Sequence, residues 1–205
     1  MSNPWEEIDL DDYEKHMSLE SVYQLQAMNE IMREQFDAYD AETVMILGIA
    51  GGNGLEHINK DEFKSVYGVD INQNYLNECK RRYSALGDVF KLICADLSDD
   101  AILLPCVDLL IANLLIEYIG YECFQKVVKK VKPKYVSCII QINTETSFVS
   151  DSPYLHVFDR LDEVHHQIEE ESLIICMNEV GYSKVLIVEK NLPNGKKLVR
   201  IDFRC

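Results

Sequence analysis

Residues 43–54 read TVMILGIAGGNG, where an apolar run of strand length passes directly into a turn of small residues. The small residues stand at alternate positions, Gly48, Ala50, Gly52 and Gly54. Glycine lets the chain turn sharply and lets a ligand approach the backbone closely. The sequence predicts a helix over 54–62, whose first free N–H groups would favour a carboxylate or phosphate. A tight turn without a ligand explains these glycines equally well, so the motif needs support from the rest of the chain.

Beyond this turn, apolar runs of strand length alternate with helical stretches. The expected strands are 65–71, 89–96, 107–113 and 135–142. The expected helices between them are 72–85, 117–130 and a short link near 98–102. Such alternation is typical of right-handed βαβ units, and continuously apolar strands indicate a sheet buried on both faces. The sequence therefore predicts a doubly wound α/β fold with a mostly parallel sheet.

The two ends of the chain depart from this alternation. Residues 183–190 and 196–205 read as strands joined by NLPNG, whose Asn-Gly and Pro signals predict an antiparallel hairpin, and a helix over 169–182 precedes them. At the other end, apolar residues recur at helical spacing over 18–39. We therefore expect a seven-stranded core domain over 43–205 and an N-terminal helical arm over 1–42.

Composition narrows the class of protein. The 205 residues are 47% hydrophobic and carry a formal net charge of −15, so the chain can bury a full core, while phosphate backbones and anionic membrane surfaces repel it. The seven cysteines form no C-x-x-C pair and several lie in apolar runs, which indicates reduced core thiols. The first residues lack the features of a signal peptide. We expect a cytoplasmic protein that binds neither nucleic acid nor membrane.

The charge is unevenly distributed. Residues 1–42 hold 12 acidic and 2 basic side chains, whereas the last 22 residues hold six basic and two acidic ones. The acid excess could steer a cationic ligand, or it could simply be a solvated surface. We expect the acidic arm to rest against the basic hairpin, within one molecule or across a dimer.

Polar residues end three consecutive strands of the predicted sheet. Asp70 ends the second strand, 22 residues after Gly48, and Asp96 and Asn113 end the next two. An acid at the tip of the second strand, beside a glycine turn, is placed to accept hydrogen bonds from a ribose diol. Any one acid could merely cap a helix. Three polar tips on the rim where open α/β sheets bind ligands favour a binding site.

Over residues 43–205 the sequence resembles the class I S-adenosylmethionine-dependent methyltransferases. The matching motifs, in chain order, are ILGIAGGNG, YGVD, ICAD, DLLIANLLIEYI, KKVKPKYV and the closing NEVGYSKVLIVEK…LVRIDF. The resemblance implies a Rossmann-like methyltransferase fold and S-adenosyl-L-methionine as cofactor. It also implies in-line transfer of the cofactor's methyl group to an acceptor.

The resemblance assigns roles to matching positions. The backbone around Gly48, Ala50 and Gly52 should hold the methionine part of the cofactor. Asp70 should bind the ribose, with Ile71 against the adenine. Asp96 should receive the adenine amino group, with Leu97 along the ring, and Asn113 should lie near the methionyl amine and the reactive methyl.

Two departures from the family pattern leave alternatives open. Ile46 stands where the family usually has an acid, and Ala50 stands at the second glycine position. The chain could therefore be a catalytically degenerate member that binds the cofactor or a partner. An NAD-dependent oxidoreductase fits less well, because G-I-A-G-G-N lacks two glycines of the dinucleotide fingerprint.

The acceptor follows mainly by exclusion. Motifs typical of nucleic-acid, protein-arginine and metal-dependent catechol methyltransferases are absent, which leaves a small-molecule acceptor and no metal site. By resemblance, the arm should close over the cofactor with Trp5, Tyr13, His16 and Met17. The irregular stretch 143–168 is long for a connection, and we expect it to form a lid on the acceptor site. His16 and Tyr118 are candidate bases, with His156, His165 and His166 as rivals, although each histidine could be structural. A monomer or a homodimer is expected.

Overall fold

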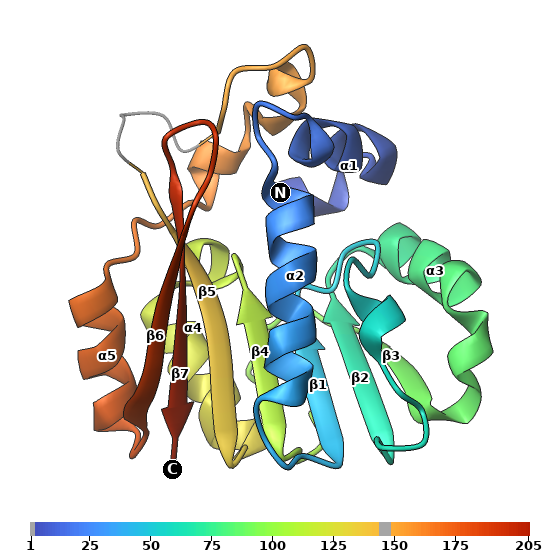
Figure 1. The fold of residues 1–205 in the computed structure, drawn as a ribbon, viewed down its shortest axis with the longest axis vertical. Coiled ribbons are helices and arrows are strands. Elements are labelled where there is room, and N and C mark those ends of the chain that lie inside the picture. The colour runs from blue at the N-terminus through green and yellow to red at the C-terminus, as the bar shows by residue number, and fades with distance from the viewer. Residues whose placement is uncertain (1–2, 144–148) are drawn as a thin grey trace.

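A seven-stranded sheet forms the centre of the computed structural model, which describes residues 3–143 and 149–205 (Figure 1). The strand order is β3-β2-β1-β4-β5-β7-β6. The strands are β1 (Thr43–Leu47), β2 (Ser65–Asp70), β3 (Phe90–Cys94), β4 (Leu109–Asn113), β5 (Tyr135–Ile142), β6 (Ser183–Asn191) and β7 (Lys197–Arg204). The first five are parallel, and β7 runs antiparallel to both β5 and β6. This confirms the predicted doubly wound sheet with a C-terminal hairpin.

Alternate residues of the central strands face two separate cores. Met45 and Leu47 of β1 pack in a cluster with α4 (Ile116–Val131) and α5 (Glu170–Glu179). Val44 and Ile46 pack on the opposite face, in a cluster with α2 (Gln24–Asp37) and α3 (Gln73–Arg82). Figure 1 shows α2 lying over the middle of the sheet, along the strands near β4 and β1. Since both faces are covered, the strands are as apolar as the sequence suggested.

The N-terminal arm contains two helices where one was expected. The predicted helix over 18–39 forms only as α2, over its residues 24–37, while α1 (Leu10–Ser18) lies before it in a stretch where no helix was predicted, and a bend separates the two. Asp9 caps α1 by accepting a hydrogen bond from the N–H of Asp11, and Tyr23 breaks the helical path with a φ of 55°. A turn of 3-10 helix, Pro4–Glu6, precedes α1.

Two other predicted helices do not form. The segment 54–62 contains only a 3-10 turn, Leu55–His57, and 98–102 contains turns. Gly54 begins the first segment with a φ of 91°, a conformation outside the right-handed helix, and a side chain there would collide with Met32 of α2. Helix α2 therefore occupies the face of the sheet that the predicted helix would have covered.

The acidic arm contacts the basic hairpin, as expected, and also other parts of the fold. Glu30 of α2 pairs with Lys190, and Glu34 lies 3.7 Å from Arg200. Other arm acids pair elsewhere, Glu14 with Arg82 of α3 and Glu7 with Arg160. Within the residues described, no helix combines the length and apolar character needed to cross a bilayer.

Candidate functional site

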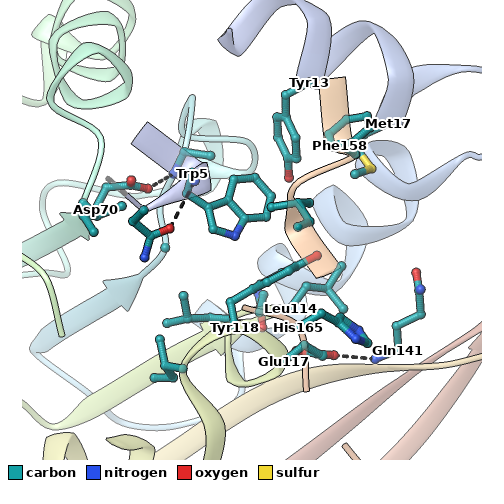
Figure 2. A pocket seen from close by; sticks show the side chains of 18 of the residues that line it. Trp5, Tyr13, Met17, Asp70, Leu114, Glu117, Tyr118, Gln141, Phe158 and His165 are labelled. Carbon is teal, nitrogen blue, oxygen red and sulfur yellow. Dashed lines mark hydrogen bonds between the residues drawn. The ribbon is translucent and has the colours of Figure 1, made fainter. Parts of the chain in front are cut away.

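A pocket lies at the carboxyl ends of β1, β2 and β4, where the strand order reverses direction. Ligands of open α/β sheets bind in such a crevice. Its floor includes Gly48, Ala50, Asp70, Ile71, Asp96, Leu97 and Asn113. The arm contributes Trp5, Tyr13, His16 and Met17, and the segment after β5 contributes Phe158, Leu161 and His165 (Figure 2). The pocket thus brings together most of the residues that the sequence singled out.

The turn after β1 joins the pocket floor to Asp70 at the tip of β2. Gly48 and Ala50 both have positive φ angles, 66° and 47°, so the chain doubles back and points its amides toward β2. The N–H of Ala50 donates to Oδ2 of Asp70 at 2.9 Å, and the N–H of Asn72 donates to Oδ1 at 2.9 Å. Burial raises the pKa of Asp70, while these backbone hydrogen bonds oppose that shift. Each oxygen keeps a further lone pair for a hydroxyl donor.

Asn113, at the tip of β4, is held by a buried amide pair. Its Nδ2 donates to Oε1 of Gln35 at 2.8 Å, and Nε2 of Gln35 donates back to its Oδ1 at 2.9 Å. Gln35 is fully buried and also donates to Ser137, whose hydroxyl donates to Asp202. This network from α2 through the sheet fixes the orientation of Asn113 at the pocket.

Asp96, Ile71 and Leu97 line the part of the pocket on the β2–β3 side. Asp96 is exposed, and its Oδ1 accepts hydrogen bonds from the N–H and the hydroxyl of Ser98. Ile71 and Leu97 are half-buried. Two apolar side chains beside an acceptor oxygen suit a flat, partly polar ring.

The first turn of the arm is fastened directly to the β2–α3 connection. Nδ2 of Asn72 donates to the carbonyl of Trp5 at 2.9 Å, and the hydroxyl of Tyr75 donates to the carbonyl of Ile8 at 2.9 Å. The Trp5 ring meets the Tyr118 ring edge to face, with centroids 4.8 Å apart, and the Tyr13 ring at 5.9 Å. Figure 2 shows the indole between Asp70 and Tyr118. The arm therefore forms one wall of the pocket.

His16 is buried and linked to the segment after β5. Its Nδ1 lies 2.6 Å from the hydroxyl of Ser152, and its ring packs on Phe158. Burial, assisted by the charge of Lys196, lowers the pKa of His16 to about 4. The imidazole is therefore neutral at pH 7 and binds a proton weakly. Its low pKa, its contact with Ser152 and its packing on Phe158 suit a structural link better than a base.

Tyr118 lies beside an acid that the sequence did not single out. Burial raises the pKa of Tyr118 above its ordinary value. Its neighbour Glu117, in the first turn of α4, is only 5% exposed and also lines the pocket. Oε1 of Glu117 accepts the N–H of Gln141 at 2.8 Å, whereas Oε2 has no hydrogen-bond partner among the residues described. Burial raises the pKa of Glu117 to about 7.

The comparisons with known proteins agree with this arrangement. Residues 46–134 match the family model described as methyltransferase domain. These residues therefore form a methyltransferase domain, as the sequence resemblance implied. No curated protein sequence gives a significant match. The cofactor of this methyltransferase is S-adenosyl-L-methionine.

Several solved structures share the fold at low sequence identity. The N-methyltransferase NodS from Bradyrhizobium japonicum WM9, in complex with S-adenosyl-L-homocysteine, superposes with a TM-score of 0.66 at 12% identity, over 95% of this chain and 97% of that one. Magnesium protoporphyrin IX methyltransferase from Synechocystis PCC 6803 gives 0.62 at 12% identity, over 93% and 83%. The [4+2]-cyclase SpnF gives 0.65 at 10% identity, over 87% and 80%. At these identities the likeness shows the fold alone.

Two positions that the family resemblance placed near the cofactor, Gly52 and Ile46, are not among the residues that line the pocket of this methyltransferase. Gly52 faces α3, where an added Cβ would lie 2.7 Å from the Tyr83 ring and 2.8 Å from the sulfur of Cys79, so its glycine serves packing. Ile46 is 4% exposed within the α2-side core. In this chain the position of the family's usual acid therefore belongs to the core.

The remaining candidate bases differ in their surroundings. His165 lines the pocket, 6.0 Å from the Tyr118 ring, and burial lowers its pKa. The N–H of His166 donates to the carbonyl of Glu117 at 2.6 Å. His156 is exposed and is not among the pocket residues. No metal-binding group of three or more His, Cys, Asp or Glu side chains occurs in residues 3–143 and 149–205.

Sequence reasoning missed the polar residues of the upper pocket. Gln24, Gln141 and Lys196 line it from α2, β5 and the hairpin. None belongs to a motif, and only the fold brings these distant positions together. Residues 144–148 of the predicted acceptor lid lie outside the described residues, so the lid over 143–168 stays a prediction.

Proposed function

We propose that this methyltransferase acts on a small-molecule acceptor by in-line transfer. The observation that carries the proposal is the continuity of the pocket from the glycine turn to Phe158 and His165, under the cover of the arm. When bound, the cofactor supplies an electrophilic methyl group. The protein's contribution is to align the two reactants and exclude water, which suits an enclosed pocket better than an open groove.

The floor of the pocket supports binding of the cofactor as the family resemblance implies. Asp70 offers two carboxylate oxygens, already oriented by the amides of Ala50 and Asn72, to a ribose diol. Gly48 lines the pocket with a φ of 66°, a conformation that favours glycine, and a Cβ there would lie 3.0 Å from Leu115. Asn113 donates through Nδ2 to Gln35 and to the sulfur of Met32, and its Oδ1 keeps a second lone pair for a donor at the methionyl end.

Calorimetry with S-adenosylhomocysteine tests the assignment of Asp70. We expect the wild type to bind and Asp70→Asn to bind about 10- to 100-fold more weakly, because a hydrogen bond to a charged group contributes about 1.5–3 kcal/mol. Asp61→Asn, which changes an exposed acid outside the pocket, is the matched control and should bind like the wild type. Equal binding by the two variants would overturn the ribose contact.

The acceptor class is tested separately with labelled S-adenosylmethionine and a cell extract divided by molecular mass. We expect label in the low-mass fraction. Label confined to protein or nucleic acid would contradict a small-molecule acceptor. Cofactor binding without transfer to any fraction would favour the catalytically degenerate alternative.

A further inference from the structure

Glu117 has a buried carboxylate oxygen that accepts no hydrogen bond from the residues described. The side chain is 5% exposed, and Oε2 has no partner among residues 3–143 and 149–205. An unpartnered buried carboxylate is costly, because the desolvation of a charge is not repaid. The same side chain lines the pocket, so a ligand is placed to supply the missing donor.

The position of Glu117 is fixed by the fold. It lies in the first turn of α4, directly beyond the tip of β4 that carries Asn113. Oε1 accepts the N–H of Gln141 from β5, and its carbonyl accepts the N–H of His166. Two parts of the chain thus hold the residue in place, and Figure 2 shows the hydrogen bond between the carboxylate and Gln141 in the part of the pocket that Tyr118 and His165 line.

The surroundings favour a cationic partner for this carboxylate. Tyr118, Trp5, Tyr13 and Phe158 place aromatic rings around the pocket, and ring faces attract cations. The net charge of −15 raises the local concentration of cations around the molecule. Lys196 also lines the pocket, but its charge acts on the pKa of His16 and of His165 and is not among the causes that shift the pKa of Glu117. A hydroxyl could donate to Oε2, but it would bring no charge to balance the carboxylate.

We propose that Glu117 binds the acceptor nitrogen and removes its proton, so that the acceptor is a primary or secondary amine. This inference rests on the proposed function. The ammonium form of the amine donates to Oε2 and transfers one proton to it, which leaves a neutral nitrogen with a lone pair. That nitrogen forms the new N–C bond to the methyl carbon as the S–C bond breaks, with its electron pair remaining on sulfur. The product leaves as a methylated ammonium ion, and the carboxyl proton passes to water.

The ionisation of Glu117 suits this step. Its pKa of about 7 is close to neutrality, where a group can both accept a proton from the acceptor and release it afterwards. The titratable groups near it are Tyr118 on the same helix, Cys138 on β5, His165, whose ring centroid lies 6.0 Å from that of Tyr118, and His166, whose N–H donates to the Glu117 carbonyl. Burial raises the pKa of Tyr118 and Cys138 and lowers that of His165, so these three remain uncharged at pH 7.

The test compares amines with alcohols of matched shape on the complex with S-adenosylhomocysteine. The probes are benzylamine, phenethylamine, N-methylbenzylamine and the corresponding benzyl and phenethyl alcohols. Calorimetry measures their binding, and release of S-adenosylhomocysteine from the donor-loaded enzyme measures transfer. We expect the amines to bind more tightly than the alcohols and to be methylated at nitrogen.

The decisive variant is Glu117→Gln, which keeps the size of the side chain and a carbonyl oxygen for Gln141. We expect it to bind the amines about 10- to 100-fold more weakly and to leave binding of the alcohols and of S-adenosylhomocysteine unchanged. Glu122→Gln removes the same charge from an exposed position of α4 and should behave like the wild type.

The outcomes separate this inference from the function on which it rests. If S-adenosylhomocysteine binds but amines bind no better than alcohols, or bind equally well to Glu117→Gln, the amine assignment is wrong and the cofactor assignment stands. If the wild type does not bind S-adenosylhomocysteine, the assigned cofactor site itself is wrong. Should Glu117→Gln be poorly folded, Glu117→Asp, which retains the charge, must restore the preference for amines.

Discussion

Burial shifts the pKa values of two pocket residues in opposite directions. Burial raises the pKa of Glu117 from 4.5 to about 7 and lowers that of His16 from 6.5 to about 4. In both cases the folded state disfavours the charged form. Their effects on stability oppose each other between about pH 4.5 and pH 6.5. Each effect is therefore measured by comparing the wild type with a variant that lacks only that titratable side chain.

Replacing Glu117 by Gln should change the pH dependence of stability. Between pH 4.5 and 7 the folded protein holds a proton on Glu117 that the unfolded chain has lost, so this group's contribution to stability falls as pH rises. We expect the free energy of unfolding of Glu117→Gln, relative to the wild type, to increase by about 3 kcal/mol from pH 4.5 to pH 7. Urea unfolding at a series of pH values measures it.

His16→Asn provides the comparison of opposite sign. Between pH 4 and 6.5 the unfolded chain binds a proton on His16 that the folded protein does not, so the contribution of His16 to stability rises with pH and should be lost in the variant.

A wild type and a Glu117→Gln variant with parallel pH profiles would show that the carboxyl of Glu117 is not buried as the structure has it.

At the scale of helices and strands, the sequence was informative where the hydrophobic pattern was decided locally. All seven strands follow from apolar runs and turn residues, and α4 and α5 lie within one to three residues of their predicted limits. The segment 54–62 shows the opposite case. Leu55 and Ile58 have helical spacing, yet they pack under Met32 and Phe36 of α2. That competition comes from a distant part of the chain, so no local pattern could reveal it.

The end of α4 offers a test of how local conformation contributes to stability. Lys132 caps the helix in the left-handed region, with a φ of 51°, and is exposed. A non-glycine residue pays about 1–2 kcal/mol there, whereas glycine does not, although glycine also makes the unfolded chain more flexible. We expect Lys132→Gly to raise the free energy of unfolding by about 0.5–1 kcal/mol, measured by urea denaturation.

The matched control lies three residues earlier on the same helix. Lys129 is exposed with helical geometry, so Lys129→Gly should lower the free energy of unfolding by about 1 kcal/mol. Two variants that shift stability in the same direction would show that Lys132 is not strained.

At the scale of the whole molecule, the arm and the core form a single site. The excess of acidic residues in the arm was visible in the sequence, but its partners were not, because Arg82 and Arg160 become neighbours of the arm only through the fold. The same reason explains the site. Motifs identified the floor at Gly48, Asp70 and Asn113, whereas Glu117 gains its importance from burial against β5, which composition and spacing do not report.

If the arm is a wall of the cofactor site, ligand binding should protect it from exchange. Exposed, lightly packed segments open with small free energies, and a ligand that contacts them suppresses that opening. The arm is fastened through Trp5 and Ile8 to Asn72 and Tyr75, beside Asp70. We therefore expect S-adenosylhomocysteine to slow amide exchange over residues 4–17 together with the turn at 48–52, measured by hydrogen-exchange mass spectrometry. Trp5→Ala should lose the protection of the arm and retain that of the turn. Protection of the turn alone in the wild type would mean that the arm packs on the domain without sensing the ligand.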